Sequence, residues 1–94
     1  MRSRYTTEIV NNVICIEDTG DEHWDETRSV TDDLDNVIAD LKERGFDLTL
    51  PIIYKDTETG LWDAVMVRDD RFDGFQRLCV ESRSAAIFEV TRED

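Results

Sequence analysis

The residues best suited to chemistry gather in residues 17–26, where six of ten positions are acidic and none is basic. Carboxylate oxygens and the imidazole of His23, the only histidine, are ligands that divalent cations accept. The spacing does not follow an EF-hand loop, which needs acidic residues at alternating positions and a closing glutamate. We therefore expect no metal and no other cofactor. A weak divalent-metal-binding module is an alternative, and its candidate ligands would be Asp18, Asp21, Glu22, His23, Asp25 and Glu26.

A catalytic centre would need a nucleophile with a base, a metal, or a matched pair of carboxylates. Cys15 and Cys79 each lie inside an apolar run, which predicts buried, free thiols. A disulfide between them is the less favoured alternative. The chain contains no Gly-x-Ser-x-Gly, P-loop or His-x-x-x-His motif, and carboxylate pairs carry little information among 23 acidic residues. We therefore predict a protein that is not an enzyme and has no catalytic residue.

The net charge of −12 is concentrated in one part of the 94-residue chain. Residues 17–40 hold ten acidic residues against one basic residue, Arg28, a formal charge of −9 that leaves −3 for the rest. Binding to nucleic acid or anionic lipid needs clustered Lys and Arg, so we expect neither partner. A local field of one sign instead favours encounter with a basic protein surface.

Trp24 lies in the middle of this charged stretch. An aromatic side chain flanked by charges is a typical anchor of protein interfaces, although Trp24 could equally fold back onto the core. The candidate partner-binding residues are the acidic residues around this tryptophan and at the start of the following helix: Glu17, Asp18, Asp21, Glu22, Trp24, Asp25, Glu26, Asp32 and Asp33.

A second interpretation gives the charge no partner at all. The chain has fourteen Asp and nine Glu, but its basic residues are nine Arg and only two Lys. Many aspartates with few lysines are typical of a solvating surface in a salt-adapted protein. A halophilic or housekeeping domain whose acidic surface only solvates it is therefore the main alternative.

One helix must position the end of the acidic stretch. Between residues 31 and 44 the apolar residues recur at helical spacing, which predicts an amphipathic helix at about 29–44. These apolar residues are Leu34, Val37, Ile38 and Leu41. Acidic residues in its first turn and Lys42 and Arg44 in its last turn complement the helix dipole. Gly45 is placed to end the helix in the left-handed conformation.

The remaining elements read as strands. Residues 5–18 predict a hairpin turning at Asn11-Asn12, with one bulged strand as the alternative. Strands follow over residues 46–55, 61–67 and 75–81, with turns at 56–60 and 68–71 and a second turn at 72–74. In residues 82–94, apolar residues alternate with polar ones, which favours a strand, although a short helix could begin near Ser84.

These elements predict one α+β domain over residues 1–94, with a small antiparallel sheet of four to six strands and one helix on one face. The other sheet face should be partly polar or covered by a partner, and a homodimer could form through that face or an edge strand. No apolar run is long enough to span a membrane, and residues 1–7 lack the apolar stretch of a signal peptide. We therefore expect a cytoplasmic protein.

Two fragments resemble a group of short, largely uncharacterised bacterial proteins carried on phages and integrative elements. One is Ser29-Val30-Thr31-Asp32-Asp33-Leu34-Asp35-Asn36-Val37-Ile38-Ala39-Asp40-Leu41, whose beginning is similar to an SVTN-type helix start. The other is Ile53-Tyr54-Lys55-Asp56-Thr57-Glu58-Thr59-Gly60-Leu61-Trp62-Asp63, followed by Phe72-Asp73-Gly74-Phe75, similar to a YRD-x-x-G-x-WD hairpin. Lys55 stands where the pattern has Arg, and Asp32 where it has Asn. The resemblance implies a mobile-element protein and assigns no activity.

Within the second fragment, Tyr54 and Trp62 could pair across two strands, while Asp56 and Gly60 close the turn. An exposed aromatic and acidic binding patch is the alternative for the same residues. Charge and size together suggest a nucleic-acid mimic, as many anti-restriction and anti-CRISPR proteins are. We therefore predict an acidic interaction protein that acts as a nucleic-acid mimic. Its predicted partners are basic host proteins of the defence or DNA-binding kind.

Overall fold

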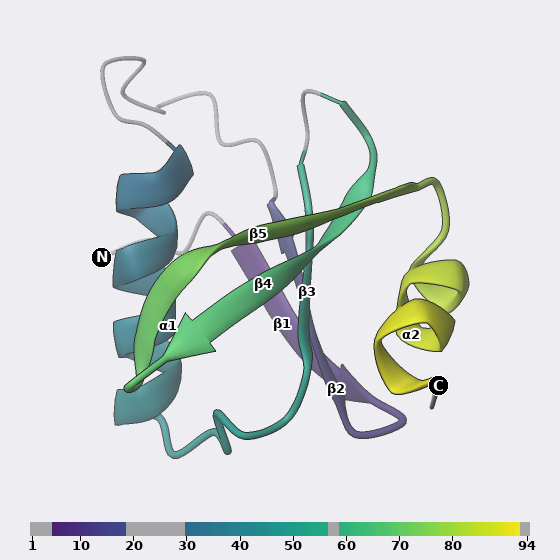
Figure 1. The fold of residues 1–94 in the computed structure, drawn as a ribbon. Helices are drawn as coiled ribbons and strands as arrows, with labels where there is room; N and C mark the ends of the chain where they lie inside the picture. The colour runs from purple at the N-terminus through teal and green to yellow at the C-terminus, as the bar shows by residue number, and fades with distance from the viewer. Residues whose placement is uncertain (1–4, 19–29, 57–58, 93–94) are drawn as a thin grey trace.

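The computed structural model describes residues 5–18, 30–56 and 59–92. The elements are, in chain order, β1 (Tyr5–Val10), β2 (Val13–Asp18), α1 (Val30–Glu43), β3 (Ile52–Lys55), β4 (Trp62–Arg68), β5 (Arg71–Val80) and α2 (Arg83–Thr91). The five strands form one sheet in the order β1-β2-β3-β4-β5 (Figure 1). This is the predicted α+β class, with a strand number inside the predicted range.

One pair of strands departs from the antiparallel pattern. β2 and β3 run parallel, with Ile14 opposite Ile52 and Ile16 opposite Tyr54. The three other pairs are antiparallel. Parallel neighbours cannot be joined by a tight turn and need a crossover. Here α1 lies between β2 and β3 in the chain, so the acidic residues 17–33 run from the end of β2 into a crossover connection.

Helix α1 forms for the reasons that its sequence predicts. Leu34, Val37, Ile38 and Leu41 are buried against an apolar cluster on one sheet face that includes Ile14, Ile16, Ile52, Tyr54 and Val65. Burying each such aliphatic side chain contributes about 1.5–3 kcal/mol. Gly45 adopts φ +86°, and the amides of Gly45 and Phe46 donate to the carbonyls of Lys42 and Leu41. These two hydrogen bonds satisfy carbonyl groups of the last helical turn and end α1.

The prediction of a strand in residues 82–94 is wrong, because this segment forms α2 and the alternative of a short helix is confirmed. The Ser82 hydroxyl oxygen accepts a hydrogen bond from the Ala85 amide at 3.1 Å, which caps the helix. Ala86 and Ile87 then pack with Val13, Cys15, Ile53 and Trp62. In Figure 1 the two helices lie on opposite sides of the sheet, so α2 covers part of the face opposite α1.

Two tight turns match their sequences. Asn11 and Asn12 have φ of +51° and +61° between β1 and β2, which confirms the predicted hairpin. Asp69 and Asp70 have φ of +53° and +61° between β4 and β5. Asn and Asp tolerate the left-handed conformation that such two-residue turns require.

Two other strand predictions need correction. Residues 72–74 form no turn, because β5 continues through them with an irregularity at Asp73: Met66 pairs with Gly74 but Val67 pairs with Phe72. This bulge lets Phe72 and Phe75 both pack against the α1-side cluster. The strand predicted from Phe46 begins only at Ile52. Before it, Asp47 accepts hydrogen bonds from Thr49, which competes with strand pairing.

Candidate interaction surface

The predicted partner-binding residues fall mostly on the connection between β2 and α1. Asp21, Glu22, Trp24, Asp25 and Glu26 lie outside the described residues, as does His23. Four others are placed by their elements: Glu17 and Asp18 end β2, and Asp32 and Asp33 lie in the first turn of α1. The candidate surface is therefore anchored at one strand end and one helix start.

Glu17 is the one predicted partner-binding residue whose side chain the structure describes. It is exposed, and its Oε2 lies 3.8 Å from Nζ of Lys55, which stands opposite Glu17 in the parallel β2–β3 register. A pair this long and this exposed contributes little to stability. Glu17 thus stays accessible, with part of its charge offset by Lys55.

Asp40, the last acidic residue of the charged stretch, has a structural role. The Tyr5 hydroxyl donates to its Oδ2 at 2.8 Å, and Nη1 of Arg44 lies 3.1 Å from the same atom. The hydrogen bond from Tyr5 is the main cause that lowers the pKa of Asp40, and the hydrogen bond and positive charge of Arg44 lower it further. Asp40 therefore ties β1 to α1, whereas Asp35, five residues earlier in the same helix, is exposed.

The aromatic residues of the 54–63 hairpin do not form an exposed patch. Tyr54 and Trp62 are both 4 % exposed, and they belong to the clusters on opposite faces of the sheet. They cannot pair across strands, because the register puts Tyr54 opposite Asp63 and Lys55 opposite Trp62. The predicted positive φ of Gly60 is confirmed at +71°, and its amide donates to the Asp56 carbonyl, while residues 57–58 of this turn lie outside the described residues.

Asp63 has a role that the sequence did not indicate. Its Oδ1 accepts from the amides of Leu78 at 2.9 Å and Cys79 at 3.1 Å. These amides lie where the β4–β5 register shifts, between the pairs Trp62–Val80 and Ala64–Gln76. The carboxylate thus satisfies backbone donors that the interrupted strand ladder leaves without carbonyl partners.

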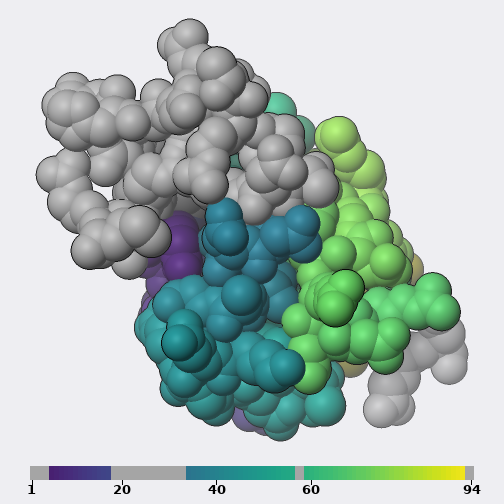
Figure 2. Space-filling model, turned by 90° about the vertical axis from the view of Figure 1, so that its left-hand side faces the viewer, coloured from purple at the N-terminus to yellow at the C-terminus, as the bar shows by residue number. Residues whose placement is uncertain are grey.

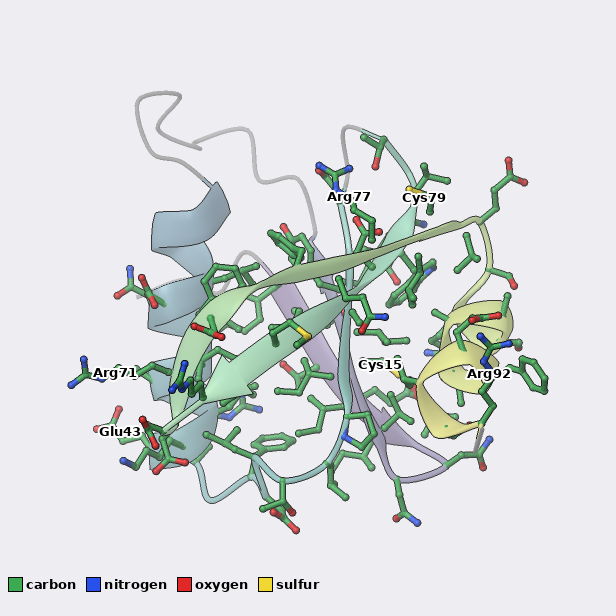
Figure 3. All side chains as sticks on the ribbon, viewed as in Figure 1. Cys15, Glu43, Arg71, Arg77, Cys79 and Arg92 are labelled. Atoms are coloured by element: carbon green, nitrogen blue, oxygen red, sulfur yellow. The ribbon has the colours of Figure 1, made fainter. Side chains whose placement is uncertain are left out.

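The two cysteines are free, as predicted, but only one is buried. Burial raises the pKa of Cys15, which packs beneath α2. The prediction of a buried Cys79 is wrong: this residue adopts φ +53° in the irregular part of β5 and is exposed. Leu78 and Val80 pack inward on either side of it. Figure 3 shows Cys15 and Cys79 well apart.

Across residues 5–18, 30–56 and 59–92, no three His, Cys, Asp or Glu side chains are grouped so that they could hold a metal ion. Most ligands of the alternative metal site lie outside those ranges. None of the described helices is long and apolar enough to cross a membrane. Comparisons of the chain with models of protein families, with curated proteins and with solved structures gave no match.

Proposed function

We propose that this chain is a non-enzymatic interaction protein of phage or mobile-element type that binds a basic protein through residues 17–33. One observation carries the proposal: residues 17–40 hold a formal charge of −9 out of −12. A charge so concentrated accelerates encounter with a basic surface and fixes its orientation.

The position of these residues in the fold supports the proposal. They end β2 and begin the connection from β2 to the adjacent parallel strand β3, and long connections carried on a rigid sheet are where binding residues concentrate. The buried apolar residues of β2 and α1 hold both ends of the connection. The chemistry of the partner follows from the charge: a protein that itself binds nucleic acid offers a groove lined with Lys and Arg.

Competition with DNA tests this function. The protein is immobilised, exposed to a bacterial lysate freed of nucleic acid, and eluted with duplex DNA at physiological salt. We expect DNA to release the bound proteins. The quadruple variant Asp21→Asn/Glu22→Gln/Asp25→Asn/Glu26→Gln should retain about tenfold less of them, since several charge pairs at an interface together exceed the ~1.4 kcal/mol of a tenfold change.

The matched control removes four carboxylates from elsewhere: Glu43→Gln/Asp73→Asn/Glu81→Gln/Glu93→Gln. It has the same net charge as the quadruple variant but keeps residues 17–40 intact. Equal losses in the two variants would mean that total charge alone drives binding. Unchanged binding in the first variant would remove the proposed surface.

A further inference from the structure

The sheet has two edge strands, β1 and β5, and only β1 is regular. In Figure 2 the purple β1–β2 hairpin lies on the opposite side of the molecule from the green β4–β5 hairpin. β5 has two register shifts against β4 and positive φ at Gly74 and Cys79, and such irregularities hinder pairing with another strand. β1 pairs with β2 without a shift from Tyr5 to Val10, and none of its residues has a positive φ. Its outer edge is therefore a regular template for a further strand.

One hydrogen bond identifies the backbone groups on that outer edge. The Ile14 amide donates to the Pro51 carbonyl at 2.9 Å, so it points towards β3 and away from β1. Ile9 and Ile14 are therefore a non-hydrogen-bonded pair of the β1–β2 ladder. Because the two kinds of pair alternate along antiparallel strands, the N–H and C=O groups of Ile9 and Thr7 point outwards. No described strand lies beyond β1 to bind them.

The side chains of β1 make the same edge apolar and nearly uncharged. Ile9 is 49 % exposed, one of three large apolar residues that are well exposed in the described part of the chain. Glu8 is the only charged residue of β1, and its Oε2 lies 3.0 Å from Nη1 of Arg83. In a protein with a net charge of −12, another copy can therefore approach this edge with little local repulsion.

We propose that two copies of this chain form a homodimer in which their β1 strands pair antiparallel, with Thr7 opposite Thr7 on a two-fold axis. The axis is perpendicular to the sheet, so one continuous sheet crosses both copies and keeps both α1 helices on one side. In this register Ile9 lies opposite Tyr5 of the second copy, an aromatic and β-branched pair that symmetry repeats. The outward amide and carbonyl of each Thr7 bond to those of the other. The occupant is a second copy because β1 is complementary to itself.

Neighbouring registers fit less well. An axis at Glu8 places two carboxylates directly opposite each other, and like charges in that position are destabilising. An axis at Thr6 leaves Ile9 uncovered, because its opposite position lies before the start of β1. An axis at Ile9 brings Thr7 opposite Asn11, which has φ +51° and belongs to the turn. The register centred on Thr7 therefore covers Ile9 and avoids a like-charge pair.

The sequence alone predicts that a homodimer could use either an edge strand or the sheet face opposite α1. α2 covers part of that face, whereas the edge of β1 is open. Repulsion between two chains of −12 opposes association, so the dimer should be tighter when salt screens it. The dimer does not rest on the function proposed for residues 17–33, since β1 contains none of them.

Sedimentation equilibrium of the full chain, from about 10 µM to about 1 mM in about 0.3 M KCl, tests the dimer. A contact of six residues per chain is smaller than a standard interface, so we expect a Kd of about 100 µM. Ile9→Lys should raise this Kd at least about tenfold, because a lysine on an edge strand opposes pairing and occurs twice in the dimer. Phe88→Lys makes the same charge change at an apolar residue of α2 that is 63 % exposed, and it should leave the Kd unchanged.

Amide hydrogen exchange of the unmodified, ¹⁵N-labelled chain identifies the strand. At about 1 mM, where about four fifths of the chains are dimeric at the expected Kd, exchange of the Thr7 and Ile9 amides should be about fivefold slower than in dilute solution. The Glu8 amide already faces β2, so its exchange should change little.

Three results would overturn the proposal. A chain that stays monomeric at about 1 mM in about 0.3 M KCl has no such dimer, and its β1 edge is then left to a strand of another protein. A dimer that Ile9→Lys leaves intact, or one without protection of Thr7 and Ile9, uses another surface. The quadruple variant of residues 21–26 should dimerise at least as tightly as the unmodified chain, because it removes repulsion. Loss of the dimer in this variant would place the contact on the acidic stretch.

Discussion

Single side chains in this protein hold together elements that are distant in the chain. Tyr5 and Asp40 are 35 residues apart, and their 2.8 Å hydrogen bond joins the first strand to α1. Asp63 similarly reaches the amides of Leu78 and Cys79 across the irregular part of β5. In a chain with 23 acidic residues, these two carboxylates are distinguished by the donors they accept from, and not by their type.

The contact between Tyr5 and Asp40 predicts a pH-dependent stability difference. Replacing Tyr5 with Phe should lower the free energy of unfolding by about 1 kcal/mol at pH 7. Because the folded pKa of Asp40 lies below its ordinary value of 3.8, the contribution is complete above that value. It is lost as pH falls through the folded pKa. Urea unfolding of both proteins between pH 7 and pH 2.5 measures the difference.

Taking the difference between the two proteins cancels groups that they share, such as Asp47, whose pKa is lowered by hydrogen bonds from Thr49. An Asp40→Asn variant, in which residue 40 carries no charge, serves as the control. In that background Tyr5→Phe should have a smaller effect, independent of pH. A loss of the same size at every pH in the unmodified background would contradict the role of the Asp40 charge.

At the scale of elements, local signals decided the outcome where they agreed with packing. α1 has an apolar stripe, a complementary charge pattern and a terminal glycine, and all three point to the same helix. In residues 82–94 the signals conflicted. Alternating apolar residues favoured a strand, but Ser82 caps a helix and two alanines, which favour helix, follow it. The helix forms because it buries Ala86 and Ile87 against one face of the sheet.

The cap of α2 provides a matched pair of variants. Ser82→Ala removes the oxygen that accepts from the Ala85 amide and should destabilise the protein by about 1 kcal/mol. Ser84→Ala changes the same residue type two positions later, where the side chain is exposed and alanine is the better helix former. Urea unfolding followed by circular dichroism should show a loss for the first variant alone. Equal effects would mean that the cap does not hold α2.

For the whole molecule, the five ion pairs between described residues do little to offset a charge of −12. In each pair both side chains are at least 34 % exposed, and such pairs contribute about 0–1 kcal/mol each. Self-repulsion therefore lowers stability in dilute buffer. The range of salt concentration over which stability increases therefore separates the proposed interaction protein from the salt-adapted alternative.

Thermal unfolding in KCl distinguishes the two. The Debye length, beyond which interactions between charges are largely screened, is about 10 Å at 0.1 M salt and about 3 Å at 1 M. We expect the Tm to rise as the first KCl is added to dilute buffer. It should level off by a few tenths molar, because most of the repulsion between carboxylates is then screened. The quadruple variant of residues 21–26 should show a smaller rise. A protein that unfolds in dilute buffer and gains stability steadily up to molar KCl would instead support a solvating role for the acidic surface.

The sequence by itself determined the charge distribution, the α+β class, α1 and the Asn11-Asn12 turn. Each depends on residues close in the chain: helical periodicity, a terminal glycine, and asparagines that accept positive φ. The acidic stretch could be identified as a candidate surface for the same reason, since its charge is contiguous in the chain.

Only the tertiary structure decided how these pieces meet. The parallel β2–β3 pairing, the exposure of Cys79 and the opposite faces of Tyr54 and Trp62 all follow from strand register, and one bulge or one shift reverses the face that a side chain occupies. An open hollow lined by Phe46, Leu48 and Val67 likewise brings together residues about twenty positions apart. No local pattern encodes such a juxtaposition, because it forms only when the β4–β5 hairpin packs beside the end of α1.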